Sequence, residues 1–449
     1  MIESMRNALT LPDLRRRIIF TILMLVVYRL VSNVPVPGVN LQSWLAFVQG
    51  DSTQGGLLGV LNLLSGGAIQ NFSVMAMGVY PYITASIIIQ LLTPIIPQLE
   101  EMASEGESGR NRINKITYYM TVPLAILQAI GQIRLIGFSI TGGLEAILPH
   151  FGLGSADLLP TVTTLMAMTA GTMFAIWLGE QITESGIGQG ISLIIFGGIV
   201  SRIPSNLLNL FSLPEQTTRI FSVVAFLLLT VITVLVIVVV QEGQRRVPVQ
   251  YGRRVRGRKV YQGQSTYVPL KVNTAGMIPI IFAQAILSFP ALIAQFFISG
   301  NGGFIDSTAG WLSTQFGSQT SFLYWFVYFL LVVGFTFFYT DVMVQQQNLP
   351  ETLQKQGGFI PGIRPGKRTN DYLMSVVRRI TFVGAVFLGI VAIMPGVMQG
   401  VGLLLNIDGL RQSATVITGA GLIIVVGVVI DTMRQLEAQL LMRHYESFI

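Results

Sequence analysis

Residues 220–259 read IFSVVAFLLLTVITVLVIVVVQEGQRRVPVQYGRRVRGRK, an apolar run followed directly by a basic one. The apolar part is long enough to cross a bilayer, because a membrane-spanning helix needs about 20 residues. The basic part belongs to the polar segment Glu242–Lys271, and a second such segment covers Gln345–Arg379. Together the two segments hold 14 of the 28 Lys and Arg residues. The sequence therefore predicts a membrane protein with two large basic loops.

The composition of the whole chain agrees with a membrane protein. Of its 449 residues 51% are hydrophobic and only 11% are charged, whereas a soluble domain has about 25% charged residues. With no cysteine and two histidines, we expect no disulfide framework, no metal site and no cofactor. The first residues do not follow the order of a cleaved signal peptide, so we expect residues 1–17 to be a short cytoplasmic segment.

Ten apolar stretches of sufficient length predict ten transmembrane helices and an all-α polytopic membrane protein. They are residues 18–34, 74–97, 116–133, 158–179, 187–203, 220–240, 274–298, 322–343, 380–398 and 412–431. Ten spans divide into an N-terminal half, 18–203, and a C-terminal half, 204–433, with a tail at 434–449. Five spans per half permit an inverted repeat, although no repeat is evident residue by residue.

The basic residues predict the orientation of the chain, because Lys and Arg accumulate in cytoplasmic loops. With the amino terminus inside, the inside segments hold 23 Lys and Arg residues and the outside segments hold four, while Arg29 lies within the first span. This asymmetry predicts that both termini and both basic loops are cytoplasmic.

The membrane-spanning stretches show no coupling site and no catalytic set. No carboxylate lies at the centre of a span, and Glu180, Asp341 and Asp431 lie at or near cytoplasmic ends. Because ion-coupled transporters commonly use an intramembrane charge, this pattern weighs against a secondary transporter, although backbone carbonyls can bind sodium. HExxH and GxSxG are absent, and residues 361–367 lack the first glycine of a phosphate-binding loop. An intramembrane protease is therefore the weakest alternative.

A short apolar segment lies between the first two spans. Leu57, Leu61 and Leu64 have helical spacing, and Ser65-Gly66-Gly67 follows them. Two interpretations remain open at this point: a helix on the outer membrane surface, or a helix that folds back into the protein. The second is permitted only where non-helical backbone is buried or faces water.

The two basic loops exceed what orientation alone requires. Val and Tyr alternate with Arg over residues 245–261, which predicts a β-hairpin with its turn near Arg256-Gly257, and the Pro and Gly residues of 357–366 predict an exposed turn. Anionic lipid attracts such charges by about 1 kcal/mol per basic residue. Two ordered protrusions favour a bulky acidic partner instead, either ribosomal RNA bound through its phosphates or an acidic patch on a motor protein.

Several long motifs resemble one family nearly from end to end. They are Pro35–Gly38, Phe72–Gln90, Glu105–Arg110, Trp177–Glu184, Gln264–Asn273 and Pro361–Gly366. In these motifs the chain resembles the SecY family, the channel-forming subunits of the bacterial Sec protein translocon. The resemblance implies two pseudo-symmetric five-helix halves around a central pore. It implies a passive channel for unfolded secretory polypeptides in the cytoplasmic membrane, not an enzyme; a ten-span transporter for a small solute is the alternative.

The resemblance also implies site residues and partners. The pore ring is expected at Val79, Ile83, Ile195, Ile281 and Ile424. A plug on the outer side is expected over 57–72, with Leu57, Leu61, Leu64, Ser65, Gly66 and Gly67. The lateral gate is expected at Thr84, Gln90, Gln128, Asn273 and Phe289, with Thr84 opposite Phe289 and a polar cluster of Gln90, Gln128 and Asn273. Partner docking is expected at Arg253, Arg254, Arg256, Arg258, Lys259, Arg364 and Lys367. The partners are SecE-like and SecG-like subunits, a SecA-type motor, the ribosome with its RNA, signal sequences, nascent chains and anionic lipids.

Overall fold

The protein is described from a computed structural model of the chain. The described residues are 11–49, 65, 67–139, 144–152, 154, 157–201, 203–204, 208, 211, 216–251, 254–256, 259–261, 265–298, 303–317, 321–347, 349–364, 366–404 and 419–446.

A helix occupies the position of each of the ten predicted spans. In order they are α2 (Pro12–Val31), α5 (Tyr80–Leu92), α7 (Glu107–Ser139), α8 (Leu158–Ser185), α9 (Gly190–Val200), α11 (Gln216–Glu242), α12 (Ile278–Phe297), α14 (Phe322–Gln347), α16 (Lys367–Leu404) and α18 (Gly419–Glu446). By length and composition alone, five of the described helices can cross a membrane, and a bent helix pair makes a sixth. The other four are short or have charged cytoplasmic turns.

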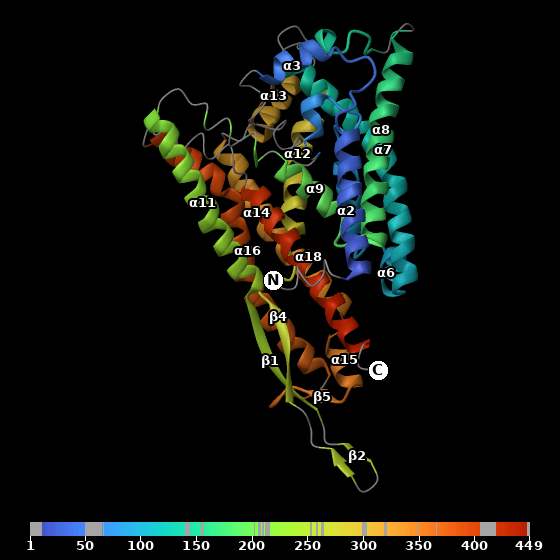
Figure 1. Cartoon of the computed structure of the whole chain (residues 1–449), viewed down its shortest axis with the longest axis vertical. Coiled ribbons are helices and arrows are strands. Elements are labelled where there is room, and N and C mark those ends of the chain that lie inside the picture. Colours follow the sequence, from blue (N-terminus) through green and yellow to red (C-terminus); the bar gives the residue numbers. More distant parts are fainter. Residues whose placement is uncertain are drawn as a thin grey trace.

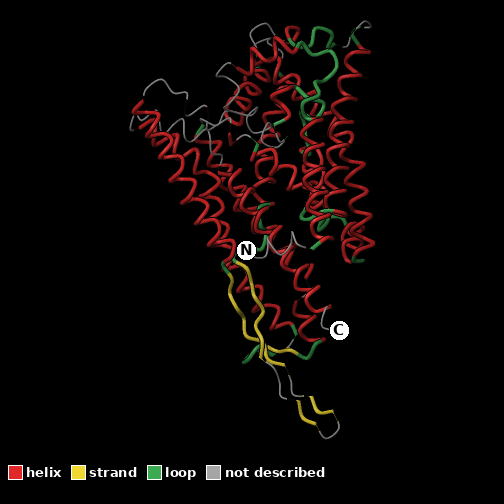
Figure 2. The backbone as a smooth tube through the Cα atoms, viewed as in Figure 1, coloured by secondary structure: helices red, strands yellow, loops and turns green. Residues whose placement is uncertain are grey.

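The helices form two groups, and the strands project from one end (Figure 1). Helices α2, α7 and α8 lie on one side, whereas α11, α14 and α16 lie on the other. Figure 2 shows the strands together beyond the helices, at the end that the charge pattern predicts to be cytoplasmic. Shorter elements complete the fold: α3 (Leu41–Gln49), η2 (Ala68–Asn71), η3 (Leu144–Ala146), α13 (Phe304–Gly317) and α15 (Leu349–Lys355).

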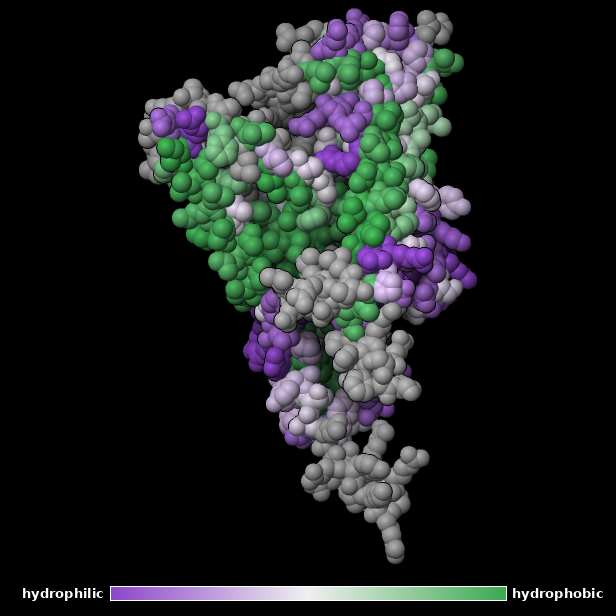
Figure 3. Space-filling view, viewed as in Figure 1, coloured by the Kyte–Doolittle hydropathy of each residue, from purple (hydrophilic) through white to green (hydrophobic). Residues whose placement is uncertain are grey.

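The outer surface of the helices is apolar. On α11, Leu227, Val231, Leu235 and Val239 are each more than half exposed, and in the space-filling view hydrophobic residues cover the sides while hydrophilic ones gather toward the ends (Figure 3). A contiguous exposed apolar surface of this kind requires a partner other than water. The membrane is that partner, because the chain has a buried core of its own beneath this surface.

The second span differs from its prediction of a helix over 74–97. Residues 74–79 form turns, and α5 begins only at Tyr80, with Pro81 in its first turn. Within this non-helical stretch Met75, Ala76 and Met77 are buried, which is the condition for irregular backbone at membrane depth. Pro81 explains the late start, because proline fits the first turn of a helix but not its interior. After Leu92 the chain bends by 100° into α6 (Pro97–Ser104).

The first basic loop is a β-hairpin, as predicted. Strand β1 (Gln244–Tyr251) pairs antiparallel with β4 (Ser265–Lys271), and at the tip β2 (Arg254–Arg256) pairs with β3 (Lys259–Tyr261). Arg256 lies opposite Lys259, a register that agrees with the predicted position of the turn, whose Gly257 lies outside the described residues. The alternation of apolar and polar residues produces this structure, because successive side chains of a strand point to opposite faces.

The two basic loops form one unit. Strand β5 (Gly358–Phe359) of the second loop pairs with β1, which makes a three-stranded sheet in the order β4-β1-β5. Its apolar side chains share a buried cluster with α14, α15 and α16, which contains Val247, Val249, Leu270, Val344, Leu353, Ile360, Leu373, Val376 and Val377. The second loop is shorter than 345–379, because α16 already begins at Lys367. We call this unit, the sheet with α15, the docking sheet.

Candidate functional site

The five residues predicted for the pore ring are all buried in one apolar cluster. Val79 immediately precedes α5, Ile83 lies on α5, Ile195 on α9, Ile281 on α12 and Ile424 on α18. Each is at most 6% exposed, and all belong to the largest apolar core of the described residues. A ring of aliphatic side chains from four helices, as predicted here, would block ions by excluding water. Because it makes no hydrogen bonds, it does not discriminate between polypeptide sequences. The role of these residues stays a prediction.

A polar contact joins the two halves across the seam where α12 packs on α5 and α7. The hydroxyl oxygens of Tyr80 on α5 and Ser288 on α12 are 2.9 Å apart, and the Tyr80 hydroxyl also donates to the Ala285 carbonyl at 3.2 Å. Tyr80 and Ser288 are both buried. We call this contact region, between α5 and α7 on one side and α12 on the other, the gate seam. Sequence reasoning missed both residues, whose only signal was a hydroxyl within an apolar helix.

The predicted lateral-gate residues are only partly brought together. Gln128 Nε2 on α7 donates to Thr84 Oγ1 at 3.2 Å. Gln90 instead donates to Ser86 within α5, and Asn273 donates to the Gly276 carbonyl. Among the hydrogen bonds of the described residues, therefore, none joins Gln90, Gln128 and Asn273 into the predicted polar cluster. Phe289 follows Ser288 on α12 and is half-buried; its position opposite Thr84 stays a prediction.

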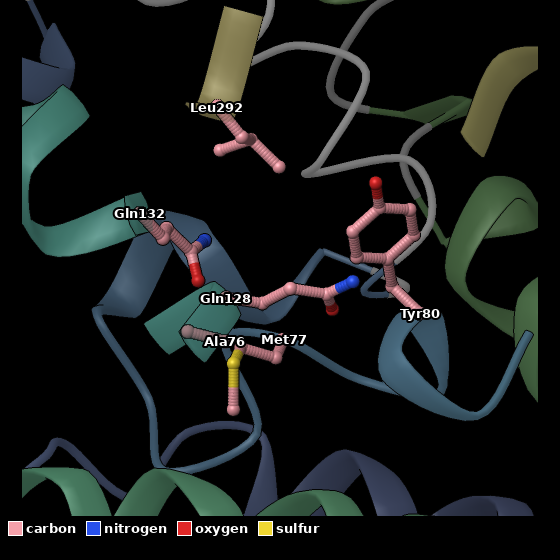
Figure 4. A pocket seen from close by; sticks show the side chains of 6 residues that line it. All are labelled: Ala76, Met77, Tyr80, Gln128, Gln132 and Leu292. Carbon is pink, nitrogen blue, oxygen red and sulfur yellow. The ribbon is translucent and has the colours of Figure 1, made fainter. Parts of the chain in front are cut away.

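A small pocket opens within the gate seam (Figure 4). It is lined by Ala76, Met77, Tyr80, Gln128, Gln132 and Leu292. The side chains of Gln128 and Gln132 are buried, and Gln128 Oε1 and Gln132 Nε2 have no hydrogen-bond partner. An unpaired buried polar atom costs about 1–3 kcal/mol. These two amide atoms would gain hydrogen bonds from water or from a peptide that entered the pocket.

The predicted plug is described only at its C-terminal end. Leu57, Leu61, Leu64 and Gly66 lie outside the described residues. Ser65 is buried, and its carbonyl accepts a hydrogen bond from the Tyr28 hydroxyl of α2 at 2.7 Å. Farther along, Trp44 Nε1 of α3 donates to the Gln70 carbonyl at 2.8 Å. This end of the segment, which includes Gly67, is therefore anchored to the N-terminal half.

The described docking residues lie at the tip of the hairpin and at the turn between β5 and α16. Arg254, Arg256 and Lys259 are on the paired strands β2 and β3, whereas Arg253 and Arg258 lie outside the described residues. Arg364 and Lys367 are exposed. The Thr369 hydroxyl donates to the Arg364 carbonyl at 3.0 Å, which fixes the turn that presents Arg364. The two loops that carry these basic residues are joined by the pairing of β1 with β5.

Two of the three carboxylates predicted at cytoplasmic span ends have side-chain partners. Tyr118 on α7 donates a hydrogen bond to Glu180 on α8, and Asp341 lies 4.0 Å from Arg378. Within the described ranges, no three His, Asp or Glu side chains are grouped so as to hold a metal ion.

Comparison with known proteins points to one family. The SecY family model matches residues 73–433. The protein translocase subunit SecY of Halalkalibacterium halodurans is 42% identical over 460 residues, covering 100% of both chains. The corresponding subunit of Thermotoga maritima is 42% identical over 453 residues, covering 100% of this chain and 98% of its own.

Solved structures share the fold. A protein-conducting channel superposes with a TM-score of 0.63 at 18% identity, covering 94% of this chain and 92% of its own. A SecY channel whose plug domain stabilises the closed state superposes with a TM-score of 0.60 at 17% identity, with the same coverage. The ten-helix prediction is thereby confirmed at the level of the fold.

Proposed function

Because the chain belongs to the SecY family of protein translocase subunits, we propose that it forms a channel whose pore ring and gate seam pass unfolded polypeptides across the membrane and release apolar segments into it. The chain is a channel subunit and not an enzyme, and the secondary-transporter alternative is not supported. It is a multi-pass protein of the bacterial cytoplasmic membrane.

One observation carries the assignment of the ring. Five aliphatic residues far apart in the sequence, from both halves of the chain, share one buried cluster. A seal of this kind has to exclude ions and still widen around any polypeptide. Aliphatic side chains suit both demands, because they exclude water and form no hydrogen bonds that have to break when the ring widens.

The gate seam supports lateral release. The Tyr80 hydroxyl contacts Ser288 and Ala285 across it, beside a pocket with unpaired amide atoms. An apolar segment that enters between α5 and α12 replaces these contacts with its own surface, and the pore then opens toward lipid. The plug segment, anchored at Ser65 and Gln70, would leave the channel by moving about that fixed end.

The docking sheet supports binding of a driving partner. The channel has no energy source of its own, so a SecA-type motor or a ribosome supplies it by binding the basic hairpin and the Arg364 turn. SecE-like and SecG-like subunits complete the assembly, and signal sequences, nascent chains and anionic lipids are its other ligands.

Reconstitution tests the function directly. The chain is placed in vesicles with SecE-like and SecG-like subunits, and a SecA-type motor, ATP and a secretory precursor are added outside. We expect the precursor to become protected from protease, and protection to require its signal sequence. Vesicles that lack this chain are the control. Equal protection with and without the chain would contradict the proposal.

Tyr80→Phe is expected to ease opening of the gate seam. The change removes the hydroxyl that contacts Ser288 and Ala285, and Ser288 still donates to the Ala285 carbonyl at 2.9 Å, so no new unpaired group is buried. One such hydrogen bond contributes about 1 kcal/mol, or about fivefold in the equilibrium between closed and open seam. Lateral release of a marginally hydrophobic segment should rise by up to about that factor.

Tyr119→Phe is the matched control, since Tyr119 lies on α7 but is 79% exposed. Glycosylation or protease mapping of the segment measures how much of it enters the lipid. A Tyr80→Phe channel that releases the segment no more often than the control would show that this contact does not hold the seam closed.

A further inference from the structure

The cytoplasmic end of α18 contacts both halves of the molecule through neighbouring residues. Arg434 lies 2.7 Å from Glu242 Oε1, and Glu242 is the last residue of α11, directly before the hairpin. The next residue, Gln435, accepts a hydrogen bond through Oε1 from the backbone nitrogen of Gly188 at 2.8 Å. Gly188 lies in the turn between α8 and α9, in the N-terminal half. One helical turn thus bridges the hairpin base and the opposite half.

The base of the hairpin is in close contact with the elements around it. The backbone nitrogen of Val272 donates to the Gly243 carbonyl at 2.8 Å, which extends the pairing of β1 and β4 toward the membrane. A side chain at Gly384 of α16 would collide with the Val272 carbonyl, so α16 packs closely here. Burial and, after it, the charge of Arg434 lower the pKa of Lys271 at the end of β4, and the nearby Asp431 and Glu242 offset only part of this lowering. Glu242 directly precedes Gly243, which pairs with Val272 at the base of the hairpin. A tilt of the hairpin therefore also moves Glu242 and its ion pair with Arg434.

The contact with the N-terminal half is equally specific. Met433 and Leu436 of α18 pack with Leu14 of α2 and Ile187 in a separate buried cluster. The Thr21 hydroxyl of α2 accepts a hydrogen bond from the Ile187 nitrogen at 3.1 Å. Gly188 has a φ of +87°, a conformation that glycine adopts without strain. The turn that Gln435 binds is thus held in place by α2.

Helix α18 also carries a pore-ring residue. It runs without interruption from Gly419 to Glu446 and includes Ile424. Arg434 follows Ile424 by ten residues, or about 15 Å along a helix. The residues between them contain no proline, a common cause of a kink in a helix, so a shift at Arg434 is passed along the helix to Ile424.

On the basis of the proposed function, we infer that Arg434 and Gln435 are positioning residues that transmit partner docking at the hairpin to the pore ring and to the N-terminal half. Docking moves the hairpin base, the Glu242–Arg434 ion pair moves α18, and the Gln435–Gly188 hydrogen bond passes the movement to the turn between α8 and α9. Neither residue is among the predicted docking residues. Their loss should lower the rate of translocation and leave partner affinity unchanged.

Charge variants of the ion pair test this inference in the reconstituted complex. Glu242→Gln and Arg434→Gln should each reduce motor-driven translocation about tenfold, while the affinity of the SecA-type motor for the vesicles stays within about twofold, a factor that corresponds to less than 1 kcal/mol. The exchanged pair, Glu242→Arg with Arg434→Glu, should restore the rate to within about threefold. Gln435→Leu, which removes only the contact with Gly188, should slow translocation in the same way.

Glu105 and Arg112 provide the matched control. They form an exposed ion pair of 3.6 Å between α6 and α7, outside the docking sheet, and exchanging their charges should leave the rate unchanged. Equal losses of rate and affinity in the Glu242 and Arg434 variants would place the pair in the docking surface and overturn the inference. Normal rates in both variants would overturn it as well. If the unaltered complex itself fails to translocate, the proposed function is wrong instead.

Discussion

Single cysteines placed at Ile83, Ile195 and Ile281 are expected to form disulfides with a cysteine in a secretory chain that is stalled in transit. The three side chains come from α5, α9 and α12 and lie in one buried cluster. A disulfide requires Cα atoms within about 7 Å of each other, so only side chains along the path of the polypeptide react. The chain has no native cysteine, so every adduct reports the introduced one.

The control lies on the same helix as Ile281. Ile293 of α12 is 40% exposed on the apolar surface, and Ile293→Cys should give no disulfide above background. Oxidation is followed by the shift of the stalled chain on a non-reducing gel. Adducts at Ile293 together with none at the three ring positions would mean that the polypeptide crosses elsewhere, and the ring would then be only a packed core.

Charge reversal at Arg364 is expected to abolish export in a channel that is folded and inserted. Arg364 is exposed on a turn that Thr369 holds in place, so its replacement by Glu disturbs no buried contact. Losing a charge-assisted contact with an acidic partner costs about 2–5 kcal/mol once the pair is desolvated, and repulsion adds to this. Partner affinity should fall at least about thirtyfold, with export falling to a few per cent.

Arg368→Glu is the matched control for this loss. Arg368 lies in the first turn of α16, is also exposed, and has the same charge, so both variants change the charge of the loop equally. Export should remain close to normal in Arg368→Glu, and protease mapping should show unchanged insertion in both. Normal export by Arg364→Glu would mean that the loop serves only to orient the chain in the membrane. An equal loss of export in both variants would mean that the partner is attracted by the overall charge of the loop and not by Arg364 in particular.

Much of the fold could be predicted from the sequence because the membrane restricts the choices. Backbone groups in lipid have to be paired within their own segment, so an apolar run such as 220–240 can only be a helix. The hairpin that carries β2 and β3 could also be predicted, because Val and Tyr alternate with Arg in its sequence and a glycine stands at the expected turn. The second span is the exception, since residues 74–79 are apolar but held as turns by protein on all sides.

The gate seam could not be predicted to the same extent. Tyr80 and Ser288 are 208 residues apart, and no local pattern relates them. Gln90, Gln128 and Asn273 are all polar residues in or beside apolar helices, yet only Gln128 reaches Thr84 across two helices. Which face of each helix meets its neighbour depends on the packing of the whole bundle.

The sequence by itself determined the ten spans, their orientation and the basic hairpin, because hydrophobic length, charge placement and alternation act over a few residues at a time. Only the tertiary structure decided that the two basic loops form one sheet through β1 and β5, and that Arg434 and Gln435 reach opposite halves. These contacts join residues separated by roughly a hundred positions or more, and they exist only once packing has placed the helices side by side.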